Sequence, residues 1–302
     1  MPSILFSILF INYFLNGKFK YFYYYIVFPL ILFNNSHYNI SKENKCSIRQ
    51  SKVFDNCDSI MRFSLNKRLS DAIISAAISF MGQPYKGNVL DIGFEGQFWD
   101  NLCEFDCVTF IENSISLGIS EHCYSSNYNS FYETLKLIRY RNGNLLNYCS
   151  RLHYFSEWIT DNEMKGILTN ITSCLGGVPF QKKINFISSN RSRYSQLNDT
   201  LMYNQLKKNE ENISKSKLYF IPKDGYYKIK SKINNGDIIA FTSNLKNLDI
   251  SHVGFAIYIN TKLHLLHASK SAGKVEITKK TLHEYLISNS QFSGIMVSRV
   301  HF

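Results

Sequence analysis

Cys107 is the residue whose type and position most directly suggest chemistry. It follows Asp106 in the stretch FDCVTFIENSISLGIS and begins a run in which apolar residues recur at helical spacing. In the first turn of a helix, unpaired backbone N–H groups and the helix dipole stabilise a thiolate. Cys107 is therefore a candidate nucleophile. The alternative is a buried cysteine that behaves as a small hydrophobic residue.

His252 is the candidate base for such a nucleophile. A catalytic cysteine needs a group that accepts its proton and a third group that orients this base. His252 opens the predicted strand SHVGFAIYI, in which it shares one face with Gly254 and Ala256. The two small residues should leave room for a helix terminus beside the imidazole. The alternative is an ordinary histidine of the sheet.

Two histidines in LHLLHAS, His264 and His267, are candidates for the third group. They are three positions apart, so in a regular strand they point to opposite faces. At most one of them can join the site. The register of the hairpin around Asn260, Thr261 and Lys262 decides which one.

Helices should position the cysteine. Apolar residues at helical spacing predict one helix within residues 69–85, with Ser70 or Asp71 as its cap. A second predicted helix starts at the cysteine motif and ends near Gly118. The chain from about 120 to 233 has a mixed pattern that includes further helical stretches.

Strands should position the histidines. Short apolar runs separated by turn residues predict strands over residues 236–243, 251–259, 263–269 and 293–300. Helices followed by strands predict an α+β fold with an antiparallel sheet. We expect a single catalytic domain over 41–302, with a helical part at about 69–233 and a β part at about 234–302.

The N-terminal residues 1–40 form a separate segment. KFK is followed by the apolar stretch YFYYYIVFPLILF, residues 21–33. A basic segment before about a dozen apolar residues predicts an export signal, because a membrane-spanning helix needs roughly 20. We expect an exported protein of the periplasm or cell envelope. Cleavage of the segment, or its retention as a membrane contact, stays open.

The composition and the charge distribution limit the kinds of partner that we expect. The 302 residues carry a formal net charge of +11, but the lysines and arginines are scattered. Zinc-finger spacing, a basic helix and an aromatic RNA-binding signature are all absent from the sequence, so we expect no nucleic-acid partner. The seven cysteines are an odd number, so at least one is unpaired within the monomer.

Six motifs occur in a characteristic order: FDCVTF, RYRNG, YCSRLHYFSEWITDN, GDIIAFT, LDISHVGFAI and LHLLHAS. Together they resemble the N-acetylmuramoyl-L-alanine amidase-like branch of the NlpC-type cell-wall hydrolases, which are papain-like bacterial cysteine enzymes. The resemblance runs from about Leu69 to Val300. It implies a papain-like fold, in which a helical part with the cysteine packs on an antiparallel, barrel-like β part with the histidine.

The resemblance also implies an activity and a set of residues. The expected reaction is hydrolysis of the amide between N-acetylmuramic acid and L-alanine in muropeptides or peptidoglycan, with no cofactor or metal. By motif, Cys107 is the nucleophile, His252 the base and His267 the orienting residue. His267 is preferred to His264 because Ala and Ser follow it as in NlpC-type enzymes generally. The expected mechanism starts from a Cys107 thiolate.

Substrate contacts are expected from Tyr85, Asp106, Arg139 and Arg151. Arginine forms bidentate pairs with carboxylates such as those of a stem peptide, although solvated surface arginines are the alternative. Asp106 either caps the helix or contacts substrate. Trp158 either stacks on a sugar or belongs to the core.

Three other functions remain open from the sequence. The chain could be an endopeptidase that cuts between D-glutamate and the diamino acid, a catalytically silent wall-binding module, or a zinc amidase. The sequence does not define the oligomeric state.

Overall fold

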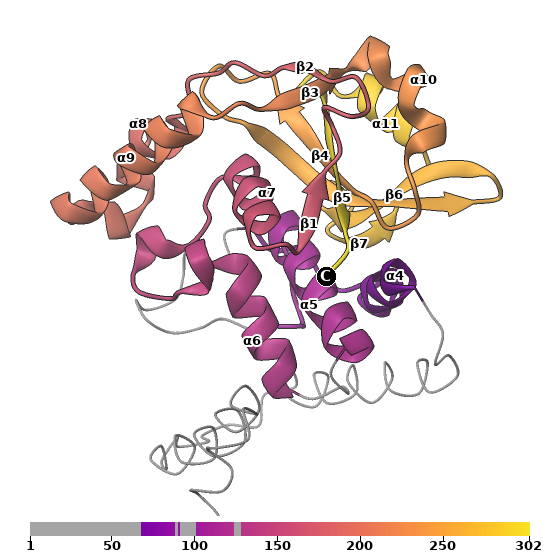
Figure 1. Cartoon of the computed structure of the whole chain (residues 1–302), viewed down its shortest axis with the longest axis horizontal. Coiled ribbons are helices and arrows are strands. Elements are labelled where there is room, and N and C mark those ends of the chain that lie inside the picture. Colours follow the sequence, from indigo (N-terminus) through magenta and orange to yellow (C-terminus); the bar gives the residue numbers. More distant parts are fainter. Residues whose placement is uncertain (1–67, 88–89, 91–100, 124–127) are drawn as a thin grey trace, which may run out of the picture. The chain divides into compact units, whose positions relative to one another are not determined.

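The computed structural model describes residues 68–87, 90, 101–123 and 128–302, all of which belong to one compact unit over 45–302 (Figure 1). The expected N-terminal export segment and most of the loop after Tyr85 lie outside these residues. The helices of the described part are α4 (Leu69–Ser79), α5 (Cys107–Cys123), α6 (Tyr128–Arg139), α7 (Phe155–Met164), α8 (Phe186–Ser189), α9 (Thr200–Lys215), α10 (Tyr226–Ile229) and α11 (Leu282–Ser288).

The described strands form one antiparallel sheet. They are β1 (Leu168–Asn170), β2 (Val178–Pro179), β3 (Tyr219–Pro222), β4 (Ile238–Ser243), β5 (Ile250–Ile259), β6 (Lys262–Ser269), β7 (Lys274–Ile277) and β8 (Phe292–Val300). Their order is β2-β3-β8-β4-β5-β6-β7, and β1 also pairs with β8. The prediction of an α+β fold with an antiparallel sheet is confirmed. Strands β1 to β3 lie within the range expected to be the helical part.

A two-residue turn fixes the register of the hairpin between β5 and β6. Asn260 and Thr261 both have positive φ, 46° and 70°, as a type I′ turn requires. Ile259 therefore pairs with Lys262, and Phe255 pairs with Leu266 further along. This register decides which histidine of β6 shares a face with His252.

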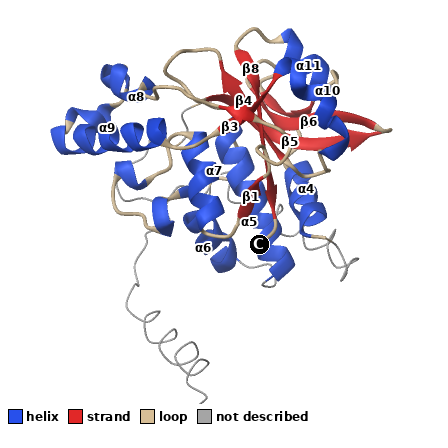
Figure 2. Cartoon of the chain, turned by 45° about the horizontal axis from the view of Figure 1, so that its top comes forward, coloured by secondary structure: helices blue, strands red, loops and turns tan. Residues whose placement is uncertain are grey.

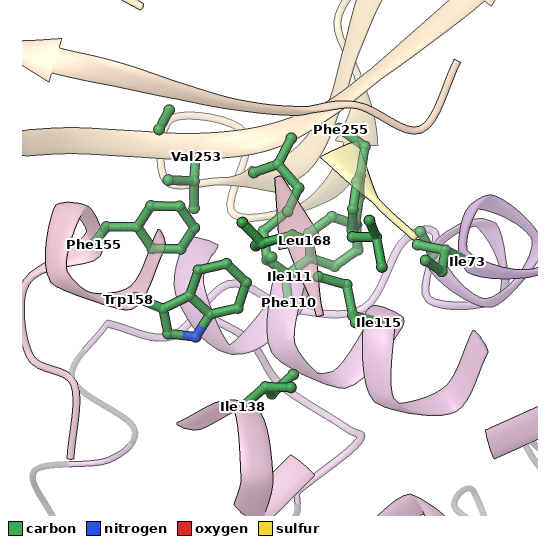
Figure 3. Close-up of a cluster of buried hydrophobic side chains, with 14 of the residues drawn as sticks. Ile73, Phe110, Ile111, Ile115, Ile138, Phe155, Trp158, Leu168, Val253 and Phe255 are labelled. Atoms are coloured by element: carbon green, nitrogen blue, oxygen red, sulfur yellow. The ribbon is translucent and has the colours of Figure 1, made fainter. Parts of the chain in front are cut away.

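The two faces of the sheet belong to two different hydrophobic cores. One face packs against α4, α5, α6 and α7 through a cluster that includes Phe110, Trp158, Val253 and Phe255 (Figure 3). The opposite face packs against α10 and α11 through Phe241, Ala256, Leu265 and others. Figure 2 shows these two sets of helices on either side of the strands.

Two sequence-based expectations need correction. Helix α5 does not end near Gly118 but continues to Cys123. A Cβ at Gly118 would lie 2.7 Å from the Cα of Ile73, so this glycine permits the close crossing of α4 and α5. Helix α4 starts at Leu69 after Arg68, without a side-chain cap from Ser70 or Asp71.

Candidate active site

The first turn of α5 places Cys107 at the helix N-terminus, as predicted. Oδ1 of Asp106 accepts hydrogen bonds from the backbone N–H groups of Val108 and Thr109, at 3.1 and 2.8 Å. Asp106 therefore acts as the N-cap of the helix, as the cap interpretation predicts. It fixes the backbone that carries the thiol.

The two histidines lie against each other on one face of the sheet. Nε2 of His252 is 2.5 Å from Nδ1 of His267, and the two rings meet edge to face. His264 points to the other face, where its Nδ1 approaches the carbonyl groups of Thr278 and Lys280. The pair leaves Nδ1 of His252 without a hydrogen-bond partner among the described residues.

In the described part of the chain, the space beside His252 is not occupied by the end of a helix, contrary to what the sequence led us to expect. Helix α5 packs against the opposite face of β5, which bears Val253 and Phe255. The room that Gly254 provides is taken by its neighbours on β6, because a Cβ there would meet Leu265 at 2.7 Å and Cβ of His267 at 3.0 Å. Gly254 thus makes room for the second histidine, not for a helix.

The first turn of α5 brings the Cys107 sulfur to the start of strand β5. Cys107 is partly exposed, and the backbone N–H of Val253, the residue after His252, lies at its sulfur. Burial, followed by the charge of Asp106, raises the pKa of the Cys107 thiol to about 12, although the N–H groups of Val253, Cys107 and Val108 oppose this rise. A raised pKa favours a neutral thiol at rest, in contrast to the thiolate that the sequence led us to expect.

Both imidazoles are neutral as well. Burial, together with the neighbouring His267, holds the pKa of His252 well below its ordinary value. Burial lowers the pKa of His267 to about 4. A neutral imidazole can accept a proton from a neutral thiol by general-base catalysis, in which the proton moves as the sulfur attacks.

Two residues that the sequence analysis did not identify complete the cluster. Tyr285 of α11 packs its ring 6.2 Å from that of His252 and 5.4 Å from that of His267. Glu276 of β7 has its Oε1 4.0 Å from Nε2 of His267. Thr281 and Glu284 form a capping box that marks the start of α11 in the sequence, but the packing of Tyr285 depends on the tertiary fold.

The structure places the expected substrate-binding residues in different environments. Tyr85 lies in the cluster: burial, and then the charges of Cys107 and Asp106, raise its pKa to about 12. Arg151 is partly buried and bonds His153. Burial raises the pKa of the Asp106 carboxyl, and the nearby positive charge of Arg151 opposes this rise.

Arg139 does not lie where a substrate could contact it. Its side chain is completely buried and forms an ion pair with Glu112, with Nε 2.7 Å from Oε2. This pair joins α6 to α5 inside the helical layer, so the expected role of Arg139 in substrate binding is corrected. Trp158 is also completely buried and stacks on Phe155, which assigns it to the core.

A cavity of about 600 Å³ adjoins the cluster. Glu276 and Tyr285 line it together with polar and basic side chains, including Lys279, Lys280 and Gln291. It offers room for a polar molecule beside Glu276 and Tyr285. Within the described ranges, no group of three or more His, Cys, Asp and Glu residues is arranged to hold a metal ion.

The described cysteines agree with the prediction of at least one unpaired thiol. Cys107, Cys149 and Cys174 are thiols outside disulfides, whereas Cys103 is in a disulfide. The Cys149 thiol is buried and donates a hydrogen bond to the carbonyl of Met202. Cys107 therefore differs from Cys149 in being partly exposed and in contacting strand β5, which carries His252.

Most of the chain matches a known protein family. The family model described as N-acetylmuramoyl-L-alanine amidase-like matches residues 75–295. The chain belongs to this family. The family supports a hydrolase that acts on peptidoglycan, and the matched range contains both the α5 cysteine and the histidine pair.

Solved structures of similar proteins extend the comparison. An N-acetylmuramoyl-L-alanine amidase from Bacteroides uniformis is 30% identical, with a TM-score of 0.72 over 78% of this chain and 100% of that one. A Bacteroides fragilis protein, provisionally named a xylanase, is 34% identical, with a TM-score of 0.69 over 74% of this chain and 99% of that one. A Legionella pneumophila protein at 24% identity shares the fold, with a TM-score of 0.65 over 85% and 97% of the two chains. No curated protein matches the chain significantly.

The helices of the described part are all too short or too polar to cross a bilayer.

Proposed function

We propose that the protein is a cysteine amidase that hydrolyses the bond between N-acetylmuramic acid and L-alanine in peptidoglycan fragments. Two contacts of strand β5 carry the proposal. His252 on β5 pairs with His267 on β6, and the backbone N–H of the next residue on β5, Val253, contacts the Cys107 sulfur. Membership of the amidase-like family supports the bond and the substrate class.

The proposed reaction begins from the neutral pair. As Sγ of Cys107 attacks the lactyl carbonyl carbon, its proton passes to Nδ1 of His252. The imidazolium that forms donates through Nε2 to His267, which keeps the ring oriented. His252 then protonates the nitrogen of L-alanine, the C–N bond breaks, and a thioester remains on Cys107. Water, deprotonated by His252, hydrolyses the thioester and releases the muramic acid carboxylate.

Backbone N–H groups supply the oxyanion hole in this proposal. The N–H groups of Cys107 and Val253 both lie beside the sulfur, where the carbonyl oxygen of a bound substrate would develop negative charge. Each well-placed donor contributes about 3 kcal/mol to the stability of such a transition state. A helix-borne cysteine opposite a strand-borne histidine is also the arrangement expected of a papain-like enzyme.

Defined muropeptides with mass spectrometry test the proposal. The wild type should release an intact stem peptide that begins with L-alanine, and Cys107→Ala should release none. A cut between D-glutamate and the diamino acid would assign the endopeptidase activity instead. Unchanged function in Cys107→Ala would support the silent wall-binding module.

A second experiment separates the thiol mechanism from a zinc amidase. Iodoacetamide should abolish hydrolysis once Cys107 is alkylated, whereas a chelator should leave it unchanged. Loss of activity to the chelator together with resistance to iodoacetamide would refute the thiol mechanism.

The xylanase name of one relative would require a different site. Glycoside hydrolysis uses a pair of carboxylates on either side of the scissile bond. Here the carboxylate next to the nucleophile, that of Asp106, is committed to capping α5. The cluster instead offers a thiol and two imidazoles, which favours amide hydrolysis.

We also propose that the protein acts after export, in the periplasm or cell envelope. The apolar stretch at residues 21–33 and the disulfide at Cys103 support this location, because disulfides persist in oxidising compartments. Cell fractionation with an antibody against the catalytic domain tests it. Recovery with the cytosolic proteins would refute it.

A further inference from the structure

A buried nitrogen of His267 lacks a partner. The side chain is 1% exposed, and its Nε2 has no hydrogen bond among the described residues. An unsatisfied buried polar atom costs about 1–3 kcal/mol, so its position calls for an explanation. The nearby acceptor is Oε1 of Glu276, at 4.0 Å.

The strand register points Glu276 at this nitrogen. His267 of β6 and Glu276 of β7 are directly opposite each other in the antiparallel ladder. Directly opposed residues place their side chains on the same face of the sheet at close range. The Glu276 side chain is 31% exposed and lines the adjoining cavity. Its backbone is fixed in strand β7, whereas its carboxylate has room to change position.

The hydrogen-bond direction between the two histidines has to be fixed for catalysis. Two neutral imidazoles share one hydrogen bond, which can run either from His252 to His267 or in reverse. If His252 donates through Nε2, its Nδ1 carries a lone pair and can accept the proton of Cys107. In the reverse direction Nδ1 of His252 carries the proton, and the ring cannot act as the base.

We propose that Glu276 is a positioning residue that sets this direction. Its carboxylate accepts the Nε2 proton of His267, so that Nδ1 of His267 must accept the proton of His252 and Nδ1 of His252 is left as the base. The inference rests on the proposed function, since it extends the chain Cys107–His252–His267 by one member. When His252 becomes an imidazolium, the carboxylate also stabilises the positive charge through His267.

Other titratable groups around His267 do not fill this role. His252 on β5 is already engaged at Nδ1 of His267. Tyr285 on α11 meets the ring of His267 edge to face, and the sulfur of Cys107 on α5 contacts the backbone N–H of Val253 on β5. Glu276 is the one acidic residue that the structure pairs with His267 among those it describes.

Nitrogen-15 NMR of histidine-labelled protein reads the tautomers directly. In the wild type, both His252 and His267 should carry their protons on Nε2. In Glu276→Ala, the signals of both rings should become those of a mixture of tautomers. Unchanged tautomers in Glu276→Ala would overturn the inference.

Kinetics on muropeptides test the consequence for catalysis. Glu276→Gln keeps an acceptor but removes the charge, and should lower kcat by about ten- to a hundredfold, the range known for the outer partner of a metal-bound imidazole. The acidic limb of kcat/KM should move to lower pH, because the loss of a negative charge disfavours the imidazolium. Glu276→Asp should restore part of kcat, which a purely structural role would not predict.

The control is Glu133→Gln on the exposed side of α6, which makes the same charge change away from the site. It should leave the tautomers and kcat unchanged. A loss in Glu276→Gln that is confined to KM would assign Glu276 to substrate binding and overturn the inference. If the wild type hydrolyses no muropeptide, the proposed function fails, whereas the NMR measurement still decides the role of Glu276.

Discussion

The two faces of strand β5 show how one segment serves both stability and chemistry. Val253 and Phe255 point into the core shared with α5, and both are completely buried. His252 and Gly254 point to the other face, where the second histidine and Tyr285 lie. Because side chains alternate along a strand, a rigid apolar face holds the polar face in position. Substitutions on the two faces should therefore have separable effects.

His252→Ala should have the largest effect, and on activity alone. Removing the base should lower kcat/KM by at least about a thousandfold, as for members of other nucleophile–base triads. His252 is partly exposed, lies outside the core shared with α5 and only borders Phe241 of the other core, so the free energy of unfolding should change less than for a buried core residue. Muropeptide kinetics and urea unfolding measure the two quantities. A comparable loss of stability would show that the faces are not separable.

Phe255→Ala should have the opposite result. The ring packs edge to face on Phe110 of α5, at 5.8 Å between centroids. Truncating a buried phenylalanine typically costs about 3–5 kcal/mol of unfolding free energy. Urea unfolding should show this loss. Folded Phe255→Ala protein, assayed at low temperature, should still be active. If it were inactive, the core face would position the site more directly than we expect.

Acid should destabilise the histidine face before the core. The folded-state pKa values of His252 and His267 lie below the ordinary value near 6.5, and that of His267 falls to about 4. Between these pH values the unfolded chain binds protons that the folded chain does not, so stability should fall as pH decreases from about 6.5 to about 4, by up to about 1.4 kcal/mol per pH unit for each group. Unfolding measured across this range should show the slope, and His267→Gln should reduce it. An unchanged slope in His267→Gln would contradict the assignment.

Gly254→Ala should have a smaller effect on both properties. The added methyl group would be too close to Leu265 and His267, which must shift to accept it. Overpacking of this kind costs about 1–3 kcal/mol. A reduced kcat with little change in KM should accompany the loss, because the histidine pair would be displaced. Wild-type kinetics in this variant would show that the pair tolerates the shift.

The mildest test compares two thiols without any mutation. Iodoacetamide reacts with thiolates, and burial raises the pKa of Cys107 to about 12, whereas Cys174 is exposed. At pH 7, peptide mass spectrometry should show faster alkylation of Cys174. The rate at Cys107 should increase as the pH rises towards about 12. Faster labelling of Cys107 at pH 7 would indicate a thiolate at rest.

The sequence predicted the central strands well because their signals are local. Strands β4, β5, β6 and β8 consist of apolar runs bounded by turn residues, and the structure has strands at all four places. Strand β7 was missed because KVEI is short and half polar. The small strands β1, β2 and β3 were missed because two to four residues carry too little pattern to predict a strand.

The site was harder to predict, for reasons that particular residues make clear. The opposite facing of His264 and His267 follows from strand periodicity, and the structure has this arrangement. The burial of Arg139 depends on how α6 packs on α5, which no local pattern records. The raised pKa of the thiol likewise depends on surrounding protein that only the folded chain assembles.

The close contact of Gly118 with α4 fixes the point about which helix α5 could tilt. The pivot is the contact with Ile73, and the sulfur of Cys107 sits eleven residues away, about 16 Å along the axis. A tilt of only about 4° at the pivot would swing the far end by about 1 Å, a displacement that can cost an enzyme about a hundredfold in rate. Gly118, although remote from the reacting atoms, therefore helps to fix the position of the Cys107 sulfur.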